Sequence, residues 1–110
     1  MKKTSIIPIP VQKTLEKLGS DIKEARIRRK ISMELMAKRA GITRPTLTKV
    51  EQGDTSTSIG IYAKVIFILG LEKNLADIAD IRNDNVGIMI ESNDLPKRAR
   101  TKKYKDINNE

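Results

Sequence analysis

A short segment at residues 43–49 gathers the side chains of this sequence that are best suited to recognising another molecule. The guanidinium of Arg44 donates from a planar fork, which matches two acceptors that lie side by side, such as O6 and N7 of guanine. The ammonium of Lys49 and the hydroxyl groups of Thr43 and Thr48 add further donors. This chemistry is hydrogen bonding to an acceptor-rich partner rather than bond breaking.

Most catalytic chemistry lacks its usual residues in this chain. The 110 residues contain no His and no Cys, which removes the commonest general base, the commonest metal ligand, disulfides and thiolate metal sites. Nothing in the sequence resembles a nucleophile paired with a base or a glycine-rich loop that holds phosphate. We therefore expect a protein that is not an enzyme, with no catalytic residue, no metal and no cofactor.

The charges are distributed in three blocks along the chain. Lys and Arg number 22 against 14 Asp and Glu, which gives a net charge of +8. Residues 1–50 carry +9, residues 51–94 carry −5 and residues 95–110 carry +4. A half that binds a polyanion and a half kept away from it would produce this pattern, which favours nucleic acid as the partner. The alternative is a set of solvated faces whose charges fall by chance.

The spacing of apolar residues predicts the helices that position the recognition segment. A chain of 110 residues suits one compact domain. Its first helix is expected from Thr14 to about Arg29, because apolar residues recur three and four positions apart. Ser58 caps a fourth helix that runs through Leu69, and a shorter fifth helix covers residues 72–79, with Ile78 facing inward.

Two short helices are expected between the first and the fourth. Ser32 caps the second helix, and Gly41 ends it by supplying a positive φ. Thr43 caps the third helix, which Gly53 closes, and Pro45 falls in its first turn, where a missing N–H is harmless. The second and third helices are therefore separated by a turn of only three residues.

Such a pair of helices crosses steeply and presents the N-terminal half of its second member to the outside. Ala37 and Ala40 are small enough to allow the approach, and the exposed half fits a DNA major groove about 12 Å wide. Leu47 and Val50 point inward. The residues left facing outward, which we expect to contact bases, are Thr43, Arg44, Pro45, Thr48 and Lys49.

Residues 32–53 (SMELMAKRAGITRPTLTKVEQG) resemble the helix-turn-helix of the phage-repressor family, which includes lambda repressor, Cro and the Xre proteins. The resemblance extends over roughly residues 14–79. It implies an all-α fold, namely a five-helix lambda-repressor-like helix-turn-helix domain that binds double-stranded DNA. In the expected organisation this domain covers residues 13–81 and follows a flexible arm at residues 1–12.

The resemblance also implies a role for individual residues. Arg44, Lys49 and Thr43 match positions that reach base edges. Met33 stands where the family commonly has a Gln that braces the recognition helix and meets the DNA backbone. Arg26 and Glu51 match a pair that often forms a structural salt bridge. The expected phosphate contacts are Lys30, Ser32, Met33, Lys38 and Thr46.

A narrower resemblance is to the HipB-type antitoxins. It rests on residues 31–40, 44–47 and 62–65, and on the Leu-Pro-Lys-Arg-Ala-Arg sequence at residues 95–100. It implies a homodimeric repressor that binds a HipA-type serine/threonine kinase toxin and regulates its own operon. The alternative is a stand-alone Xre-type or prophage regulator without a toxin partner.

The C-terminal third is expected to serve association. Residues 86–90 are apolar and fit either a strand or a short helix capped by Asp84, and we expect residues 82–95 to form a dimerisation segment, unless they pack back on the domain. Residues 96–110 have little to bury and are expected to be a disordered basic tail.

Two other classes of partner are disfavoured. Binding of single strands or RNA relies on aromatic stacking, and the chain has only Tyr62, Phe67 and Tyr104. No run approaches the roughly 20 apolar residues needed to span a bilayer, so we expect no membrane partner and a cytoplasmic location.

Overall fold

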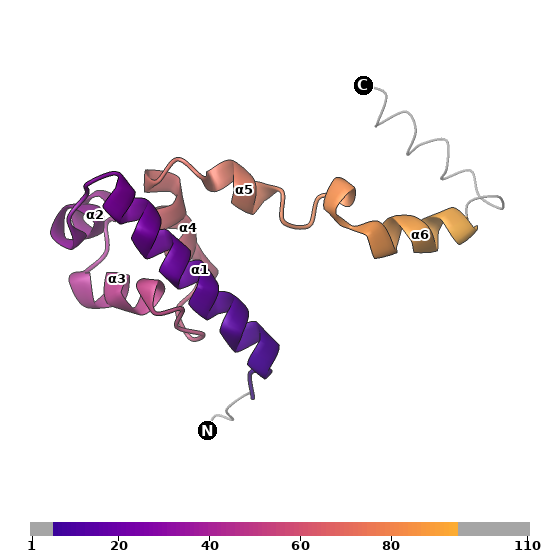
Figure 1. The fold of residues 1–110 in the computed structure, drawn as a ribbon, viewed down its shortest axis with the longest axis horizontal. Coiled ribbons are helices and arrows are strands. Elements are labelled where there is room, and N and C mark those ends of the chain that lie inside the picture. Colours follow the sequence, from indigo (N-terminus) through magenta and orange to yellow (C-terminus); the bar gives the residue numbers. More distant parts are fainter. Residues whose placement is uncertain (1–5, 95–110) are drawn as a thin grey trace. The chain divides into compact units, whose positions relative to one another are not determined.

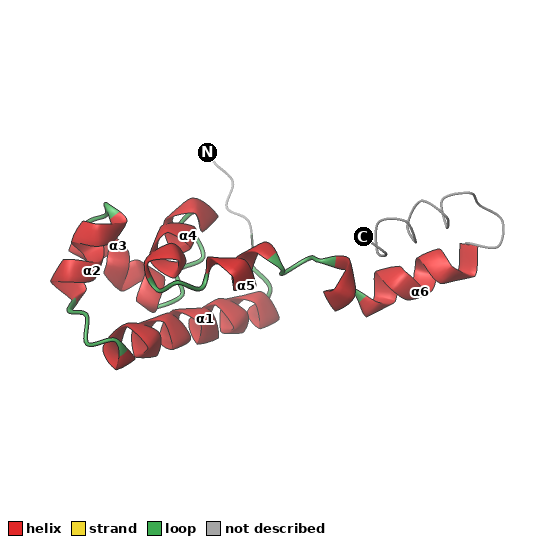
Figure 2. Ribbon diagram, turned by 90° about the horizontal axis from the view of Figure 1, so that it is seen from above, coloured by secondary structure: helices red, strands yellow, loops and turns green. Residues whose placement is uncertain are grey.

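The computed structural model describes residues 6–94, and all regular elements in this part of the chain are helices (Figures 1 and 2). They are α1 (Ile9–Arg28), α2 (Met33–Ala40), α3 (Arg44–Glu51), α4 (Ile59–Ile68), α5 (Glu72–Ala76), a 3₁₀ turn η1 (Ile81–Asn83) and α6 (Asn85–Asp94). The chain divides into two units after Leu75, earlier than the domain boundary expected at residue 81. The expected basic tail at residues 96–110 lies outside the described residues, as do residues 1–5 of the expected arm.

Helix α1 begins at Ile9 and not near Thr14, so the expectation that residues 9–12 form part of an arm is wrong. Two prolines lie at the start of this helix, at the N-cap (Pro8) and in the first turn (Pro10). The N–H groups there have no partner within the helix, so a proline costs no hydrogen bond. The carbonyl of Pro8 accepts hydrogen bonds of 3.0 Å from the N–H groups three and four residues later.

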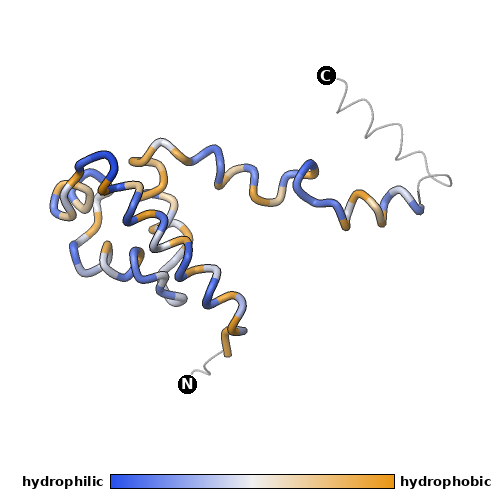
Figure 3. Tube along the Cα trace, in the orientation of Figure 1, coloured by the Kyte–Doolittle hydropathy of each residue, from blue (hydrophilic) through white to orange (hydrophobic). Residues whose placement is uncertain are grey.

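The first unit is built around one buried core. Figure 2 shows α1 on one side of this unit, with α2, α3 and α4 together on the other. The apolar stripes of these helices meet between them, and α4, the most hydrophobic helix, contributes several of the orange segments in Figure 3. The core residues are Ile22, Ala25, Met36, Ala37, Ala40, Leu47, Val50, Tyr62, Val65, Ile66 and Leu69.

Side-chain caps fix where three of these helices begin. The hydroxyl groups of Ser32, Thr43 and Ser58 accept hydrogen bonds from backbone N–H groups in the first turns of α2, α3 and α4. Each cap satisfies a donor that the helix itself leaves unpaired, which is worth about 1 kcal/mol. The helix starts expected at these three residues are therefore the observed ones.

The first four helices end with a residue in the left-handed region. After α2, α3 and α4 this residue is Gly41, Gly53 and Gly70, with φ of 69°, 75° and 79°. After α1 it is Lys30, whose φ is 56°. The N–H of Lys30 donates to the carbonyl of Ile27 at 2.8 Å, so the lysine takes the place that glycine has at the other three ends.

Two glycines allow α1 to cross closely over the end of α3. A Cβ atom at Gly19 would lie 2.6 Å from both the N atom of Gly53 and the carbonyl oxygen of Val50. A Cβ at Gly53 would in turn overlap the backbone of Leu15. Real Cβ atoms do not approach other atoms this closely, so any larger residue at either glycine would push the two helices apart.

Polar contacts tie the loop after α3 to α4. The hydroxyl of Tyr62 donates to the backbone carbonyl of Asp54 at 2.8 Å, and burial raises the pKa of this phenol. The hydroxyl groups of Thr57 and Ser56 donate to the carboxylate of Asp54 and lower its pKa. Among the described residues, no buried polar side-chain atom lacks a hydrogen-bond partner.

The second unit, described over residues 76–94, contains η1 and α6. Residues 86–90 are helical, so the strand alternative is wrong, and a carboxylate oxygen of Asp84 accepts from the N–H of Gly87 at 3.0 Å as an N-cap would. Helix α5 ends at Ala76, short of residue 79, and Ile78 is 66% exposed rather than facing inward. No residue between 76 and 93 is buried.

Candidate nucleic-acid interface

The exposed face of α3 is supported by a fully buried back. Leu47 and Val50 have no exposed surface, which fixes the helix against α1 and α2. Because residues on a helix repeat every 3.6 positions, this anchoring turns a defined set of side chains to solvent. The residues expected to contact bases are all exposed, and they are Thr43, Arg44, Pro45, Thr48 and Lys49.

Two threonines of this face use their hydroxyl groups within the protein. The Thr43 oxygen accepts from the N–H of Thr46 at 3.2 Å, and its hydroxyl donates to the Thr46 oxygen at 2.9 Å. Thr46 is half-buried. Each hydroxyl retains unused acceptor capacity, but Thr43 must give up its donor bond to Thr46 before it can donate to DNA. Among the described residues, Thr48 and Lys49 make no side-chain hydrogen bond and Arg44 makes one, to a sulfur atom, so these three side chains are the most available donors of α3.

The residues expected to contact phosphate differ in their exposure and engagement. Lys30 and Lys38 are exposed, the former in the left-handed position after α1 and the latter on α2. Ser32 is exposed, and its hydroxyl already caps α2 by accepting from the N–H of Leu35 at 3.0 Å. Met33 is half-buried and lies against Arg44, with 3.9 Å between the Met33 sulfur and Nη2 of Arg44.

Arg26 and Glu51 form a buried ion pair that connects α1 to the end of α3. Nε of Arg26 donates to Oε2 of Glu51 at 2.7 Å and Nη2 donates to Oε1 at 3.1 Å, while Nη1 donates to the carbonyl of Ile31 at 2.9 Å. The two side chains are only 8% and 6% exposed. This bidentate geometry holds the end of α3 against α1, and its burial keeps Arg26 from contacting an external partner.

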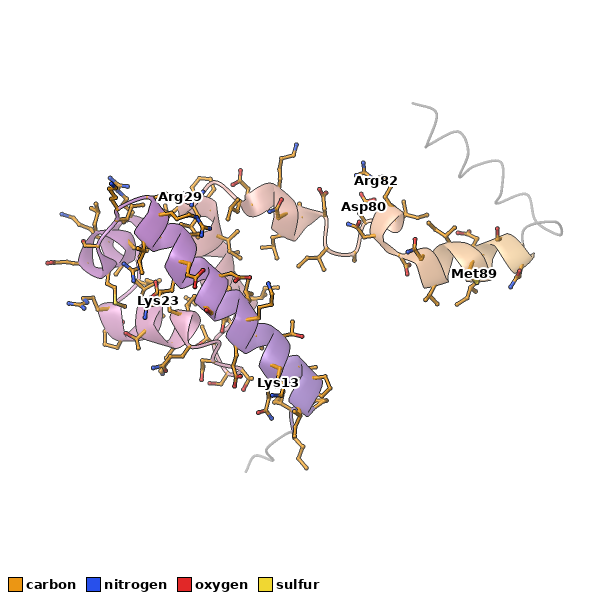
Figure 4. All side chains as sticks on the ribbon, viewed as in Figure 1. Lys13, Lys23, Arg29, Asp80, Arg82 and Met89 are labelled. Atoms are coloured by element: carbon orange, nitrogen blue, oxygen red, sulfur yellow. The ribbon has the colours of Figure 1, made fainter. Side chains whose placement is uncertain are left out.

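Further basic side chains lie on α1 and directly after it, outside the expected set. Lys13 and Lys23 project from α1, Arg29 follows its last residue (Figure 4), and all three are exposed. The guanidinium of Arg29 donates back to the carbonyl of Ala25 at 2.9 Å. The run of three basic residues at 28–30 is visible in the sequence, and it could have placed Arg28 and Arg29 beside Lys30 among the candidate phosphate contacts.

Residues 22–72 match the family model described as helix-turn-helix. This segment has the helix-turn-helix fold. The matched residues include all of α2, α3 and α4, so the domain contains the turn at residues 41–43 and the exposed face of α3. The family model is of the Xre and lambda-repressor type and supports a DNA-binding transcriptional regulator, in a family that is typically non-enzymatic.

The other comparisons add no relative to this match. No curated protein and no solved structure matches the chain significantly. The helix-turn-helix match ends before residue 76, so it carries no information about α6. Among residues 6–94, no helix is long and apolar enough to cross a membrane, and no three His, Cys, Asp or Glu side chains gather where they could hold a metal ion.

Proposed function

We propose that the chain is a sequence-specific repressor that reads double-stranded DNA with the exposed face of α3. The observation that carries this proposal is the position of Arg44 and Lys49 on a helix whose opposite side is completely buried. A helix held in this way can enter a major groove without rearranging, and a guanidinium can donate to both acceptors of a guanine edge. The exposed lysines at positions 30 and 38 would then contact phosphate.

The proposed repressor is a homodimer, and residues 82–95 are its proposed association segment. Helix α6 supplies the argument, since Val86, Met89 and Ile90 are 69%, 64% and 59% exposed. These residues lie three and four positions apart and therefore on one side of the helix. Two copies related by a two-fold axis would place their recognition helices in half-sites about 34 Å apart along the duplex.

The proposed partner of this repressor is a HipA-type serine/threonine kinase toxin, whose operon the repressor would regulate. The resemblance to HipB-type antitoxins supports this role, although its Leu-Pro-Lys-Arg sequence at residues 95–98 lies outside the described residues. DNA binding gives a cytoplasmic site of action. The competing function is a stand-alone Xre-type or prophage regulator, to which the exposed face of α3 applies equally.

Substitution of Arg44 tests the base-reading role. A duplex is first selected by the wild-type chain from a random pool, and binding of this duplex and of random DNA is then measured. We expect Arg44→Ala to weaken binding of the selected duplex by about 1–3 kcal/mol and to relax the preference at one base pair. Lys64→Ala, which removes an exposed positive charge from α4, serves as the matched control and should leave base preference unchanged. Equal losses on selected and random DNA would show that Arg44 does not read bases.

Two further measurements separate the competing functions. Competition between duplex and single-stranded DNA should be won by the duplex, and preference for the single strand would reject the groove-binding role. The antitoxin role is tested by producing the chain together with the kinase encoded beside its gene. We expect a stable complex that protects cells from the kinase, whereas a chain without a neighbouring kinase gene acts alone.

A further inference from the structure

The contact between Met33 and Arg44 joins the first residues of two helices. Met33 opens α2 and Arg44 opens α3, and the Met33 sulfur lies 3.9 Å from Nη2 of Arg44. Met33 is half-buried and packs against the core, so the core holds its side chain in place. Within residues 6–94, this contact is the one polar interaction of the Arg44 side chain.

A thioether can orient a guanidinium through a weak contact that DNA can readily replace. Sulfur is a weak hydrogen-bond acceptor, so the contact leaves the strong donors of Arg44 available to a guanine edge. An amide at this position would offer a stronger acceptor and would compete with the DNA for the same N–H groups. The thioether also carries no proton to donate, so Met33 cannot donate a hydrogen bond to phosphate, and its expected phosphate contact is limited to an apolar approach.

We propose that Met33 is a positioning residue for Arg44 and thereby sets how strictly Arg44 discriminates between base pairs. A long arginine side chain loses conformational freedom when it binds. A neighbouring side chain that already restricts its rotamers in the free protein lowers this entropic cost of binding. The Met33 side chain also limits the directions from which the guanidinium approaches the groove. This inference rests on the proposed function, because it concerns the residue proposed to read bases.

A double-mutant cycle on the full chain tests the proposal. Wild type, Met33→Ala, Arg44→Ala and the double variant are titrated against the duplex selected by the wild-type chain. Each is also titrated against duplexes that carry the other base pairs at the position most sensitive to Arg44→Ala. We expect Met33→Ala to weaken binding of the selected duplex by about three- to tenfold, the factor that matches the ordering entropy of one long side chain. The discrimination between base pairs should fall by a similar factor, and neither effect should persist in the Arg44→Ala background.

Two conservative variants of Met33 allow the test to be made even if Met33→Ala does not fold. Met33→Leu preserves an apolar wall of similar size, and we expect it to retain the melting temperature and the discrimination of the wild type. Met33→Gln adds a competing acceptor, and we expect it to lower discrimination only when Arg44 is present. Should Met33→Ala fail to fold, these two variants alone test the positioning role.

The outcomes separate this inference from the proposed function. If the wild-type chain selects no duplex, the proposed function fails. If Arg44→Ala removes base preference while the Met33 variants leave it unchanged, the proposed function stands and the positioning role of Met33 is overturned. The positioning role is also overturned if Met33→Ala weakens binding equally with and without Arg44.

Discussion

The two units of this chain use apolar residues in opposite ways. In residues 6–75 the helices bury a continuous core, and Met36, Leu47, Val50 and Val65 have no exposed surface at all. In residues 76–94 no residue up to position 93 is buried, although the segment contains four Ile, one Val and one Met. The apolar side chains of the first unit are therefore packed in its own core, whereas those of the second unit are mostly exposed.

This contrast shows how differently two short helices, α3 and α6, are stabilised. An isolated helix of about ten residues is marginal in water, because helix formation is cooperative and its nucleus is costly. Helix α6 has this length and exposes apolar side chains, which is the basis for proposing that residues 82–95 form an association segment. Helix α3 is shorter still, with 8 residues, yet it is held on its buried side by α1 and α2.

Loss of the buried ion pair should produce the largest effect on the first unit. Arg26→Ala leaves the carboxylate of Glu51, only 6% exposed, without its partner. An unpaired buried charge costs about 3–5 kcal/mol, which is a large share of the stability of a small domain. Urea unfolding followed by circular dichroism measures this loss.

Two controls define the origin of that loss. Lys17→Ala breaks an ion pair with Asp21 whose side chains are 78% and 56% exposed, and it should leave the unfolding midpoint unchanged. The double variant Arg26→Met and Glu51→Leu removes both charges and should recover most of the stability. A loss below about 1 kcal/mol for Arg26→Ala would mean that Glu51 finds another partner or water.

The close crossing of α1 and α3 gives the next largest effect. Gly19→Ala places a Cβ 2.6 Å from backbone atoms of Gly53 and Val50, and relief requires the helices to separate. We expect a loss of about 1–3 kcal/mol, measured as a lowered melting temperature. Gly60→Ala on α4 is the matched control, because the nearest atom to its Cβ would be 3.7 Å away and alanine favours the helix. Equal stability of the two variants would contradict the close packing.

Local features of the fold could be predicted from the types and spacing of the residues, whereas long-range contacts could not, and the Arg26–Glu51 ion pair was expected only from the family resemblance. The hydroxyl caps at residues 32, 43 and 58 bond to N–H groups within the first turn, so the residue type alone predicts where each helix begins. The crossing at Gly19 depends on the backbone of residues 50–53, far away in sequence, and the spacing of apolar residues contains no trace of it. The start of α1 was missed because a proline in a first turn and a proline that breaks a helix look alike.

The candidate site shows the same division. The exposed face of α3 follows from helical periodicity once Leu47 and Val50 are assigned to the core. The contact between Met33 and Arg44 depends instead on how two helices meet, and no spacing rule gives it. The left-handed conformation of Lys30 was likewise unforeseen, because glycine is the residue that ordinarily marks such a position.

Substitution of Lys30 by Gly should have a smaller effect, which raises the stability of the first unit but weakens DNA binding. Its φ of 56° is unfavourable for a residue with a Cβ, so Lys30→Gly should stabilise the first unit by about 0.5–1 kcal/mol after the added freedom of the unfolded chain is subtracted. If Lys30 contacts phosphate, the same variant should lower the slope of log affinity against log salt by about 0.9. Lys38→Gly, which removes a lysine from inside α2, should lose stability instead. An unchanged salt slope for Lys30→Gly would remove Lys30 from the phosphate contacts.

The smallest expected effect on stability is that of Ile90→Ala in the second unit, and Ile66→Ala in the first unit is its reference. Ile66 is 7% exposed in α4 and Ile90 is 59% exposed in α6. Ile66→Ala should cost about 2–5 kcal/mol, because it leaves a cavity in a packed core. Ile90→Ala should change the free energy of unfolding by at most about 0.5 kcal/mol, since it removes little buried surface and alanine favours a helix.

Protein concentration decides what the Ile90 variant reports. Unfolding is measured at a concentration low enough to keep the chain monomeric, because association would otherwise add to the apparent stability by mass action. Sedimentation of the same variant at higher concentration then measures self-association, which Ile90→Ala should weaken if α6 joins two copies. A large loss of monomer stability would show that Ile90 is packed within its own chain, and the contrast between the two units would then be wrong.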